Sequence, residues 1–152
     1  IDLKYLLAVL NSKLINAIYE SENIQVNKVF CSEIRTDRIN SLPIMWPVSD
    51  QSHLQQIIQL VDELTIGNKQ IQKLTSETID YISYENGKWK NILDIKERDL
   101  FTMLKLKKSE ESEFLAYFND QREKIKKLQF EKIENESKID VIIFKIYDIP
   151  PF

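Results

Sequence analysis

Apolar side chains recur at three- and four-residue intervals near the start of the chain, at Leu3, Leu6, Leu7, Leu10 and Leu14. This spacing predicts a helix over residues 2–19, with Asp2 as its N-cap. Further apolar residues occupy other faces of the same helix, and a helix of this kind is usually buried on more than one side. Ser12 could cap a second short helix, so the pattern also allows a break near Asn11.

The regular spacing stops over residues 21–48, where the residues that favour strand are Val26, Val29 and Phe30. Pro43 and Pro47 force extended backbone before them. The Thr-Asp pair at 36–37 is placed to cap a single helical turn. We therefore predict one or two short strands and a turn over residues 28–47, packed on the first helix.

Helical spacing returns after Ser49, with an amphipathic face formed by Leu54, Ile57, Ile58, Val61 and Leu64. The stripe continues beyond Gly67, which either stops the helix or weakens it. We predict a helix over about residues 50–82, followed by an irregular insertion over 83–108 that holds one short helix.

A second long helix is predicted over about residues 109–148. Its apolar positions follow a near-heptad spacing: Phe114, Phe118, Ile125, Leu128, Ile139, Ile142 and Ile146. Lys132 and Asn135 fall in the same register and weaken the apolar seam there. Two long helices joined by a medium connection should pack antiparallel.

These elements predict a mainly α protein with a small β component. A short α/β lobe over residues 1–48 would be followed by a helical scaffold over residues 49–152. The chain holds only two glycines and four prolines, and this scarcity favours long helices over a β-sandwich or barrel. A hydrophobic content of 43% argues against disorder.

Charge and cysteine content narrow the class of protein. The formal net charge is -3, whereas a free-standing nucleic-acid binder usually has a basic excess. Any DNA contact would need a local basic face or help from outside the chain. The single cysteine, Cys31, excludes an internal disulfide and fits a reducing compartment. No apolar run is long enough to span a membrane, and we expect no signal peptide. The first residue is not Met, which fits either a fragment of a longer protein or a processed N-terminus.

Catalytic patterns are weak throughout the sequence. His53 is the single histidine and has no partner in sequence, so a surface or core-edge role is favoured over a catalytic base. Glu136-Ser137-Lys138 imitates the Glu-x-Lys of metal-dependent nucleases, but it falls inside a predicted helix, where a solvated face is favoured. We expect no enzyme activity, metal or cofactor in this chain.

Two stretches are candidates for contact with phosphates. Arg35 and Arg38 lie on the predicted turn, where a guanidinium could bind a phosphate or a guanine edge. Pairing of these arginines with neighbouring carboxylates is slightly favoured over that role. The second stretch holds Lys124, Lys126 and Lys127, for which a helix surface laced with salt bridges is favoured.

The stretches YLLAVLNSKLIN, KVFCSEIRTDRINSLPI and QIIQLVDELT follow one another, and a long run from ESEFLAYF to IIFKIYDI closes the series. In this order they resemble the C-terminal specificity (target-recognition) region of type II restriction-modification methyltransferases, the TaqI-like specificity domain family. The resemblance covers most of the chain, best at 5–62 and 110–149. Near the C-terminus Phe144 replaces a tyrosine of the family pattern, Asp148 a glycine and Pro150 a threonine.

The resemblance implies a fragment that contributes DNA sequence specificity and scaffolding to a larger parent protein. That parent would be a DNA adenine methyltransferase that uses S-adenosylmethionine. The resemblance leaves open whether the parent also has a fused endonuclease and binds a divalent metal. The partners would be double-stranded DNA, the methyltransferase domain and another copy of the chain, all in the cytoplasm. Lys13, Lys28, Arg35 and Arg38 are the residues expected to contact DNA. The alternative is a helical protein–protein interaction module without DNA contact.

Overall fold

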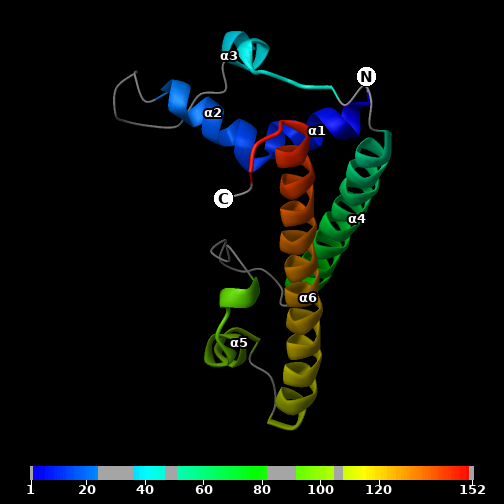
Figure 1. The fold of residues 1–152 in the computed structure, drawn as a ribbon. Coiled ribbons are helices and arrows are strands. Elements are labelled where there is room, and N and C mark those ends of the chain that lie inside the picture. Colours follow the sequence, from blue (N-terminus) through cyan, green and yellow to red (C-terminus); the bar gives the residue numbers. More distant parts are fainter. Residues whose placement is uncertain (1, 24–35, 47–50, 82–91, 105–107, 151–152) are drawn as a thin grey trace. The chain divides into compact units, whose positions relative to one another are not determined.

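The computed structural model describes residues 2–23, 36–46, 51–81, 92–104 and 108–150. Its elements, in chain order, are α1 (Leu3–Asn11), α2 (Lys13–Asn23), α3 (Thr36–Ser41), α4 (Gln51–Tyr81), the 3-10 helix η1 (Ile92–Asp94), α5 (Glu97–Leu104) and α6 (Lys108–Ile146) (Figure 1). No helix among the described residues has the length and apolar character needed to cross a membrane. The prediction of a mainly α protein is confirmed.

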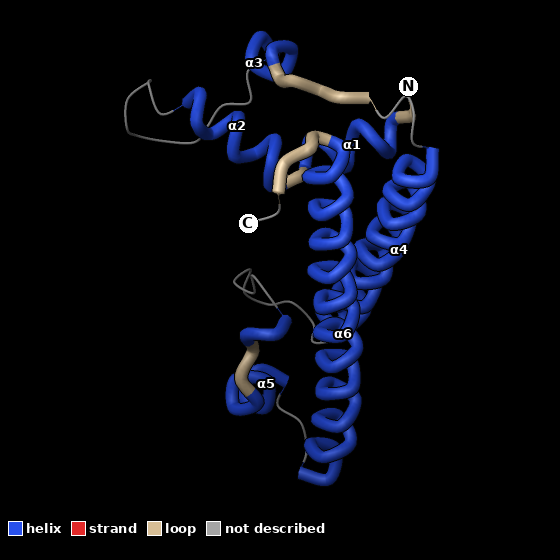
Figure 2. The backbone as a smooth tube through the Cα atoms, viewed as in Figure 1, coloured by secondary structure: helices blue, strands red, loops and turns tan. Residues whose placement is uncertain are grey.

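The predicted small β component is wrong for the part of the chain that the structure describes. No residue there lies in a strand (Figure 2). The predicted strands over 28–47 fall partly outside the described residues, and inside them Thr36–Ser41 forms a helix. Leu42–Trp46 is irregular chain, in which the N–H of Ile44 donates to the carbonyl of Leu42 at 2.9 Å across Pro43. A segment becomes a strand only when a neighbouring strand pairs with it. Here the hydroxyls of Tyr5 and Tyr147 hydrogen-bond to the backbone of the segment instead.

Packing divides the chain into two compact units, which are described separately. Unit 1 comprises residues 1–64 and 134–152, and unit 2 comprises residues 65–133. Both long helices, α4 and α6, contribute residues to each unit, and their bounds lie within two residues of the predicted ones. The predicted division of the chain after residue 48 stays a prediction.

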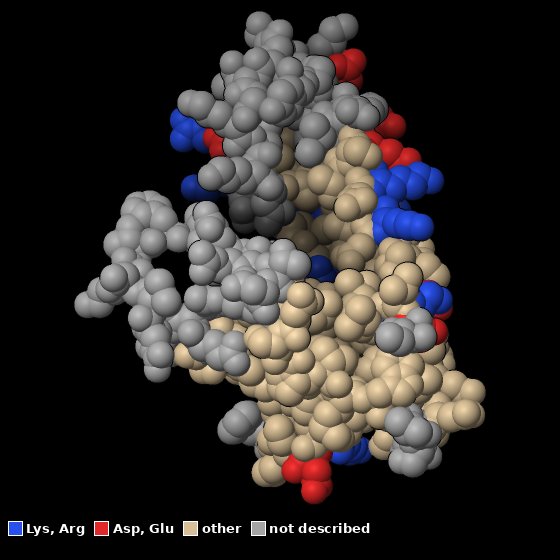
Figure 3. Space-filling view, turned by 90° about the horizontal axis from the view of Figure 1, so that it is seen from above, with Lys and Arg blue, Asp and Glu red and all other residues tan. Residues whose placement is uncertain are grey.

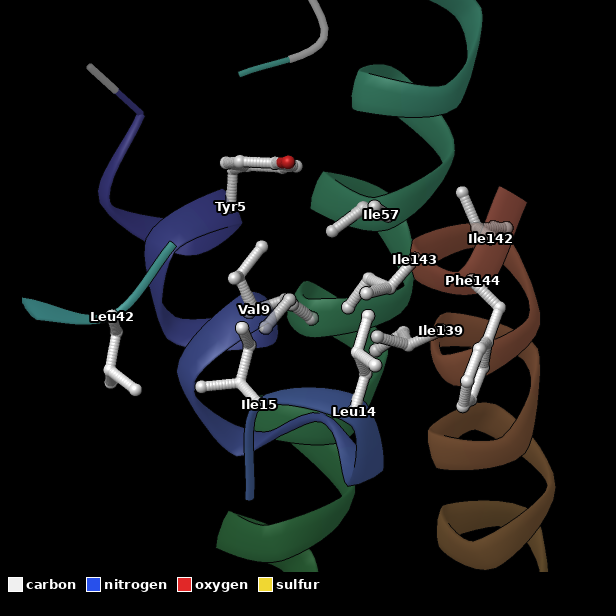
Figure 4. Packing of buried hydrophobic residues seen from close by; sticks show 12 residues of the cluster. Tyr5, Val9, Leu14, Ile15, Leu42, Ile57, Ile139, Ile142, Ile143 and Phe144 are labelled. Carbon is white, nitrogen blue, oxygen red and sulfur yellow. The ribbon is translucent and has the colours of Figure 1, made fainter. Parts of the chain in front are cut away.

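The core of unit 1 joins four helices. Its buried residues are Tyr5, Ala8, Val9, Leu14, Ile15, Leu42, Ile57, Val61, Ile139, Ile142, Ile143 and Phe144. Figure 4 shows Leu14 of α2 beside Ile139 and Ile143 of α6. Since burying one aliphatic side chain contributes about 1.5–3 kcal/mol, this cluster supplies the main driving force for folding of unit 1.

Within unit 1, the first half of α4 and the last part of α6 lie side by side and run in opposite directions (Figure 1). The Nδ2 of Asn135 donates to Oε2 of Glu63 at 3.1 Å at one end of this pair. α1 and α2 lie across the pair, and Lys4 Nζ contacts Asp62 Oδ2 of α4 at 2.7 Å. The antiparallel pairing expected from the sequence is therefore present in unit 1.

Ser12 separates α1 from α2, as the sequence allowed. Its hydroxyl donates to the carbonyl of Val9 at 2.7 Å and accepts from the N–H of Ile15 at 3.3 Å. The same side chain thus ends one helix and caps the next, which turns the chain within a single residue. At the other end of α1, Asp2 accepts from the N–H of Lys4 at 2.8 Å and confirms the predicted N-cap.

Unit 2 has its own core, formed by Ile92, Ile95, Leu100, Phe114, Phe118 and Ile125, with Ile71 and Leu74 of α4 packed against it. The rings of Phe114 and Phe118 stack with centroids 6.2 Å apart. Arg122 lies with its guanidinium carbon 5.6 Å from the Phe118 ring centroid and donates to the carbonyl of Leu93 at 2.6 Å. Arg122 therefore joins η1 to α6 within this unit.

The end of α6 forms a Schellman motif. Asp148 has a positive φ of 52°. The N–H of Ile149 donates to the carbonyl of Phe144 at 3.0 Å, and the N–H of Asp148 donates to the carbonyl of Lys145 at 3.1 Å. Ile149 also packs against the unit 1 core, which holds Phe144. This combination of hydrogen bonds and an apolar contact is the usual way to satisfy the last carbonyls of a helix.

Candidate nucleic-acid interface

Lys13 is the predicted DNA contact that the structure describes most fully. It is the first residue of α2, and its backbone N–H donates to Oδ1 of Asp140 at 2.9 Å. Its Nζ lies 3.5 Å from Oδ2 of the same carboxylate, although the side chain is 77% exposed. Asp140, itself buried, thus caps α2 from a different helix and also holds the ammonium group of Lys13.

The other predicted contacts are only partly described. Lys28 and Arg35 lie outside the described residues. Arg38 lies in α3, and its side chain is also outside the described part. Contact of these four residues with DNA therefore stays a prediction.

The second basic stretch carries salt bridges along α6. Lys124 Nζ lies 2.6 Å from Asp120 Oδ2, and Lys126 Nζ lies 2.6 Å from Glu123 Oε1. Lys127 Nζ is 4.0 Å from a glutamate one turn further along the helix. Each of these amino groups already has a carboxylate partner, so the favoured interpretation of a salt-bridged helix surface is confirmed for them.

Charge on the face of the molecule seen in Figure 3 is mixed in sign. Figure 3 shows Lys and Arg atoms beside Asp and Glu atoms at the edge of the face in view, and most of the remaining described surface there is neutral. A protein that binds DNA through phosphates alone normally presents a continuous basic area. The described atoms of this face do not form one.

The weak catalytic patterns of the sequence lie on the two long helices. His53 is half-buried on α4, and Glu136-Ser137-Lys138 lies inside α6, where Lys138 Nζ pairs with Glu134 at 2.9 Å. Among the residues whose placement is described, no group of three or more His, Cys, Asp or Glu side chains could hold a metal ion. Cys31 lies outside them.

A group of tyrosine hydroxyls near one edge of unit 1 was not foreseen. Tyr5 of α1 donates to the carbonyl of Met45 at 2.5 Å. Tyr147, directly after α6, donates to the carbonyl of Pro43 at 2.8 Å and accepts from the N–H of Met45 at 3.0 Å. We call these two side chains the tyrosine clasp and the segment Leu42–Trp46 the strap.

Burial changes the acidity of both tyrosines of the clasp. Desolvation by burial, and secondarily the nearby Tyr147 hydroxyl, raises the pKa of Tyr5 from 10.0 to about 12. Desolvation also raises the pKa of Tyr147, partly offset by the hydrogen bond from Met45. Both hydroxyls therefore remain protonated donors over the ordinary pH range.

Two apolar grooves flank the exposed side of α6 in unit 1. One, of about 580 Å³, lies between α2 and α6 and is lined mainly by Leu14, Ala17, Ile18, Val141 and Phe144. The other, of about 510 Å³, lies between α4 and α6 and includes Leu60, Ser137 and Ile142. Both linings are mostly apolar but also hold charged side chains, among them Asp140 in the first groove and Lys138 in the second, and such grooves can accept apolar side chains of a partner.

The outer face of α1 is a third apolar surface. Leu3 is 77% exposed and Leu7 is 52% exposed, one helical turn apart. The sequence predicted a helix with surplus apolar faces, and the structure shows which of them unit 1 leaves uncovered. Contiguous exposed apolar side chains can mark a surface that binds another protein.

Sequence reasoning missed Asp140, Tyr5 and Tyr147 as structural polar groups. Each makes its contact with a residue at least 40 positions away, so no local pattern could reveal it. Ser12 was found because a capping residue next to a helix break is a local signal.

No known protein family, no curated protein and no solved structure matches the chain. The resemblance to TaqI-like specificity domains therefore stays a prediction.

Proposed function

We propose that this chain is a scaffold segment of the DNA target-recognition region of a restriction-modification enzyme. In this proposal the parent protein is a cytoplasmic DNA adenine methyltransferase that uses S-adenosylmethionine. The methyltransferase domain of the parent and double-stranded DNA are the partners of the segment. The chain itself performs no catalysis.

The supporting observation is the arrangement of unit 1. A helical layer, α1 and α2, lies across an antiparallel pair formed by α4 and the end of α6 (Figure 1). The resemblance implies this order: a helix that closes the recognition lobe, a strand and turn with Leu-Pro-Ile, then a helix that pairs with the C-terminal helix. Unit 1 has such a helix pair, whereas the implied strand is not present among the described residues. The shared core of these elements makes unit 1 suited to carry a recognition lobe on a rigid base.

A DNA-binding measurement tests the proposal. We expect the isolated chain to bind duplex DNA weakly, with an affinity that falls steeply as salt increases. If all four predicted cations contact phosphates, the slope of log K against log salt should be no steeper than about −3.6. Fluorescence anisotropy of a labelled duplex, titrated at several salt concentrations, gives both quantities.

Charge reversal supplies the matched control. Arg35→Glu together with Arg38→Glu should abolish this weak binding. Lys126→Glu together with Lys127→Glu makes the same change of charge on α6 and should weaken binding much less, because those lysines already pair with carboxylates. Equal effects of the two double variants, or tight binding that ignores salt, would contradict the proposal.

A helical protein–protein interaction module without DNA contact is the second candidate. The observation that favours it is the exposure of Leu3 and Leu7 on α1, together with the pairing of Lys13 with Asp140. The two candidates differ in one experiment on the full-length parent protein. If Arg35→Glu with Arg38→Glu leaves DNA binding and methylation unchanged, the result favours the interaction module over the DNA role.

A further inference from the structure

The groove between α2 and α6 combines apolar walls with one buried carboxylate. Its volume is about 580 Å³, which lies in the range of sites that bind small molecules. The apolar part of its lining is formed by Leu14, Ala17, Ile18, Val141 and Phe144. Asp140 lines the same groove, and only 9% of this residue is exposed. Small-molecule sites commonly have this composition, in which a few polar groups orient a ligand that is otherwise held by apolar contacts.

The two oxygens of Asp140 are held unequally by the protein. Oδ1 accepts from the backbone N–H of Lys13 at 2.9 Å, an ordinary hydrogen-bond length. Oδ2 has Nζ of Lys13 at 3.5 Å, which is longer than the distance of about 2.7–2.9 Å that is usual between an ammonium group and a carboxylate. The Lys13 side chain is also 77% exposed, so solvent weakens this ion pair. Oδ2 therefore keeps the capacity to accept a hydrogen bond from a second cation.

A cation inside the groove would be better placed than the ammonium group of Lys13. Lys13 holds its ammonium group in water, whereas an ammonium group on an apolar chain would reach Asp140 with that chain against the apolar walls. Ser137 lies three residues before Asp140 on α6 and also lines the groove, where its hydroxyl oxygen can accept a further hydrogen bond. An anionic ligand would bring like charges together at Asp140, so the groove favours a cation.

We propose that the groove between α2 and α6 binds a small cationic amphiphile, namely a primary ammonium group on an apolar chain. The ammonium group would bind Oδ2 of Asp140, and the chain would lie against Leu14, Ile18 and Val141. In the bound state the ligand replaces the Lys13 ammonium group, which turns to solvent. This site is separate from the proposed role toward DNA and does not depend on it.

Two probes that differ in charge at one end test the proposal on the full chain. n-Octylammonium and 1-octanol have apolar chains of the same length, but only the first is a cation at neutral pH. We expect octylammonium to bind about tenfold more tightly, which is the usual effect of a hydrogen bond to a charged group. Titrations followed by methyl NMR give both affinities. The signals of Leu14 and Ile18 should shift, and that of Leu60, in the groove between α4 and α6, should not.

The ratio of the two affinities is then compared between charge variants. Asp140→Asn keeps an acceptor for the N–H of Lys13 but removes the charge, so octylammonium should bind about as weakly as octanol. Lys13→Gln removes the competing ammonium group and should raise the preference for octylammonium by about two- to fivefold, the range for an exposed ion pair. Glu134→Gln removes a carboxylate from the groove between α4 and α6 and is the matched control, which should leave the ratio unchanged.

Three results would overturn the proposal. The first is equal affinity for the two probes, or no binding of either, in the wild-type chain. The second is an unchanged ratio in folded Asp140→Asn. The third is an equal loss of preference in Glu134→Gln, which would show a general attraction of the cation to surface carboxylates. Circular dichroism checks that Asp140→Asn is folded. If it is not, Lys13→Gln decides alone, because it changes only an exposed side chain, and an unchanged ratio there would reject the site.

Discussion

Asp148 adopts a backbone conformation that suits glycine. Its φ of 52° lies in the left-handed region, where a side chain normally raises the energy of the backbone by about 1–2 kcal/mol. Aspartate tolerates this region better than most residues, and the Schellman hydrogen bonds around it offset part of the cost.

Asp148→Gly should therefore stabilise unit 1. We expect a gain of up to about 1 kcal/mol, limited by the larger chain entropy of glycine in the unfolded state. Urea unfolding followed by circular dichroism measures the change. Ser137→Gly, in the exposed interior of α6, is the matched control and should lose about 0.5 kcal/mol. A loss of stability in Asp148→Gly would contradict the strain argument.

At the scale of elements, α2 depends on a cap that comes from another helix. Asp140 of α6 accepts from the N–H of Lys13, while Ser12 accepts from the N–H of Ile15. Together they satisfy two of the N–H groups that a helix leaves free at its start. The contact also ties α2 to α6 beside the core that both helices share.

Loss of this cap should destabilise unit 1 more than loss of the ion pair. Asp140→Ala removes an acceptor from a part-buried N–H and should cost about 1–3 kcal/mol in the free energy of unfolding. Asp140→Asn keeps an acceptor and should cost less. Lys13→Met removes only an exposed ammonium group and should cost under about 1 kcal/mol. Comparable losses in Lys13→Met and Asp140→Ala would show that the charge pair, and not the cap, is what matters.

The helices themselves follow from local patterns that the sequence displays. Asp2 and Ser12 are capping residues beside apolar stripes, so both ends of α1 could be predicted. Gly67 does not interrupt α4, because the apolar stripe on either side favours one continuous helix. The strap could not be predicted. Pro43 indicates extended backbone before it, which suggested a strand. The groups that bind the strap backbone are the hydroxyls of Tyr5 and Tyr147, which lie far away in the sequence.

At the scale of the whole molecule, the division into two units follows the apolar register of α6. Ile125 belongs to the core of unit 2, and Ile139 belongs to the core of unit 1. Between them the seam passes Lys132 and Asn135, the polar positions that the sequence analysis identified as a weak stretch. The boundary of the units at 133/134 lies in this stretch, because a polar seam cannot bury a continuous core.

The candidate DNA contacts were far less predictable than the fold. Lys13 was selected for its charge, and the structure shows that a buried carboxylate far along the chain holds it. A charge pattern reveals which side chains are basic but not which partner each one meets. The same limit applies to Lys124 and Lys126, whose partners are near in sequence and were foreseen for that reason.

The stability of the whole chain should depend on alkaline pH through the tyrosine clasp. Folding raises the pKa of Tyr5 from 10.0 to about 12, and it also raises that of Tyr147. Below pH 10 both the folded and the unfolded states hold these protons, so the contribution to stability is complete. Above pH 10 the unfolded state loses them more readily, and the contribution falls as the pH rises through about 12.

Urea unfolding of the wild type and of Tyr5→Phe across this range measures the effect as a difference, since all other titrating groups are shared. The gap in stability between the two proteins should narrow as the pH rises. A gap for Tyr5→Phe that does not change with pH would show that the Tyr5 hydroxyl is not buried against the strap.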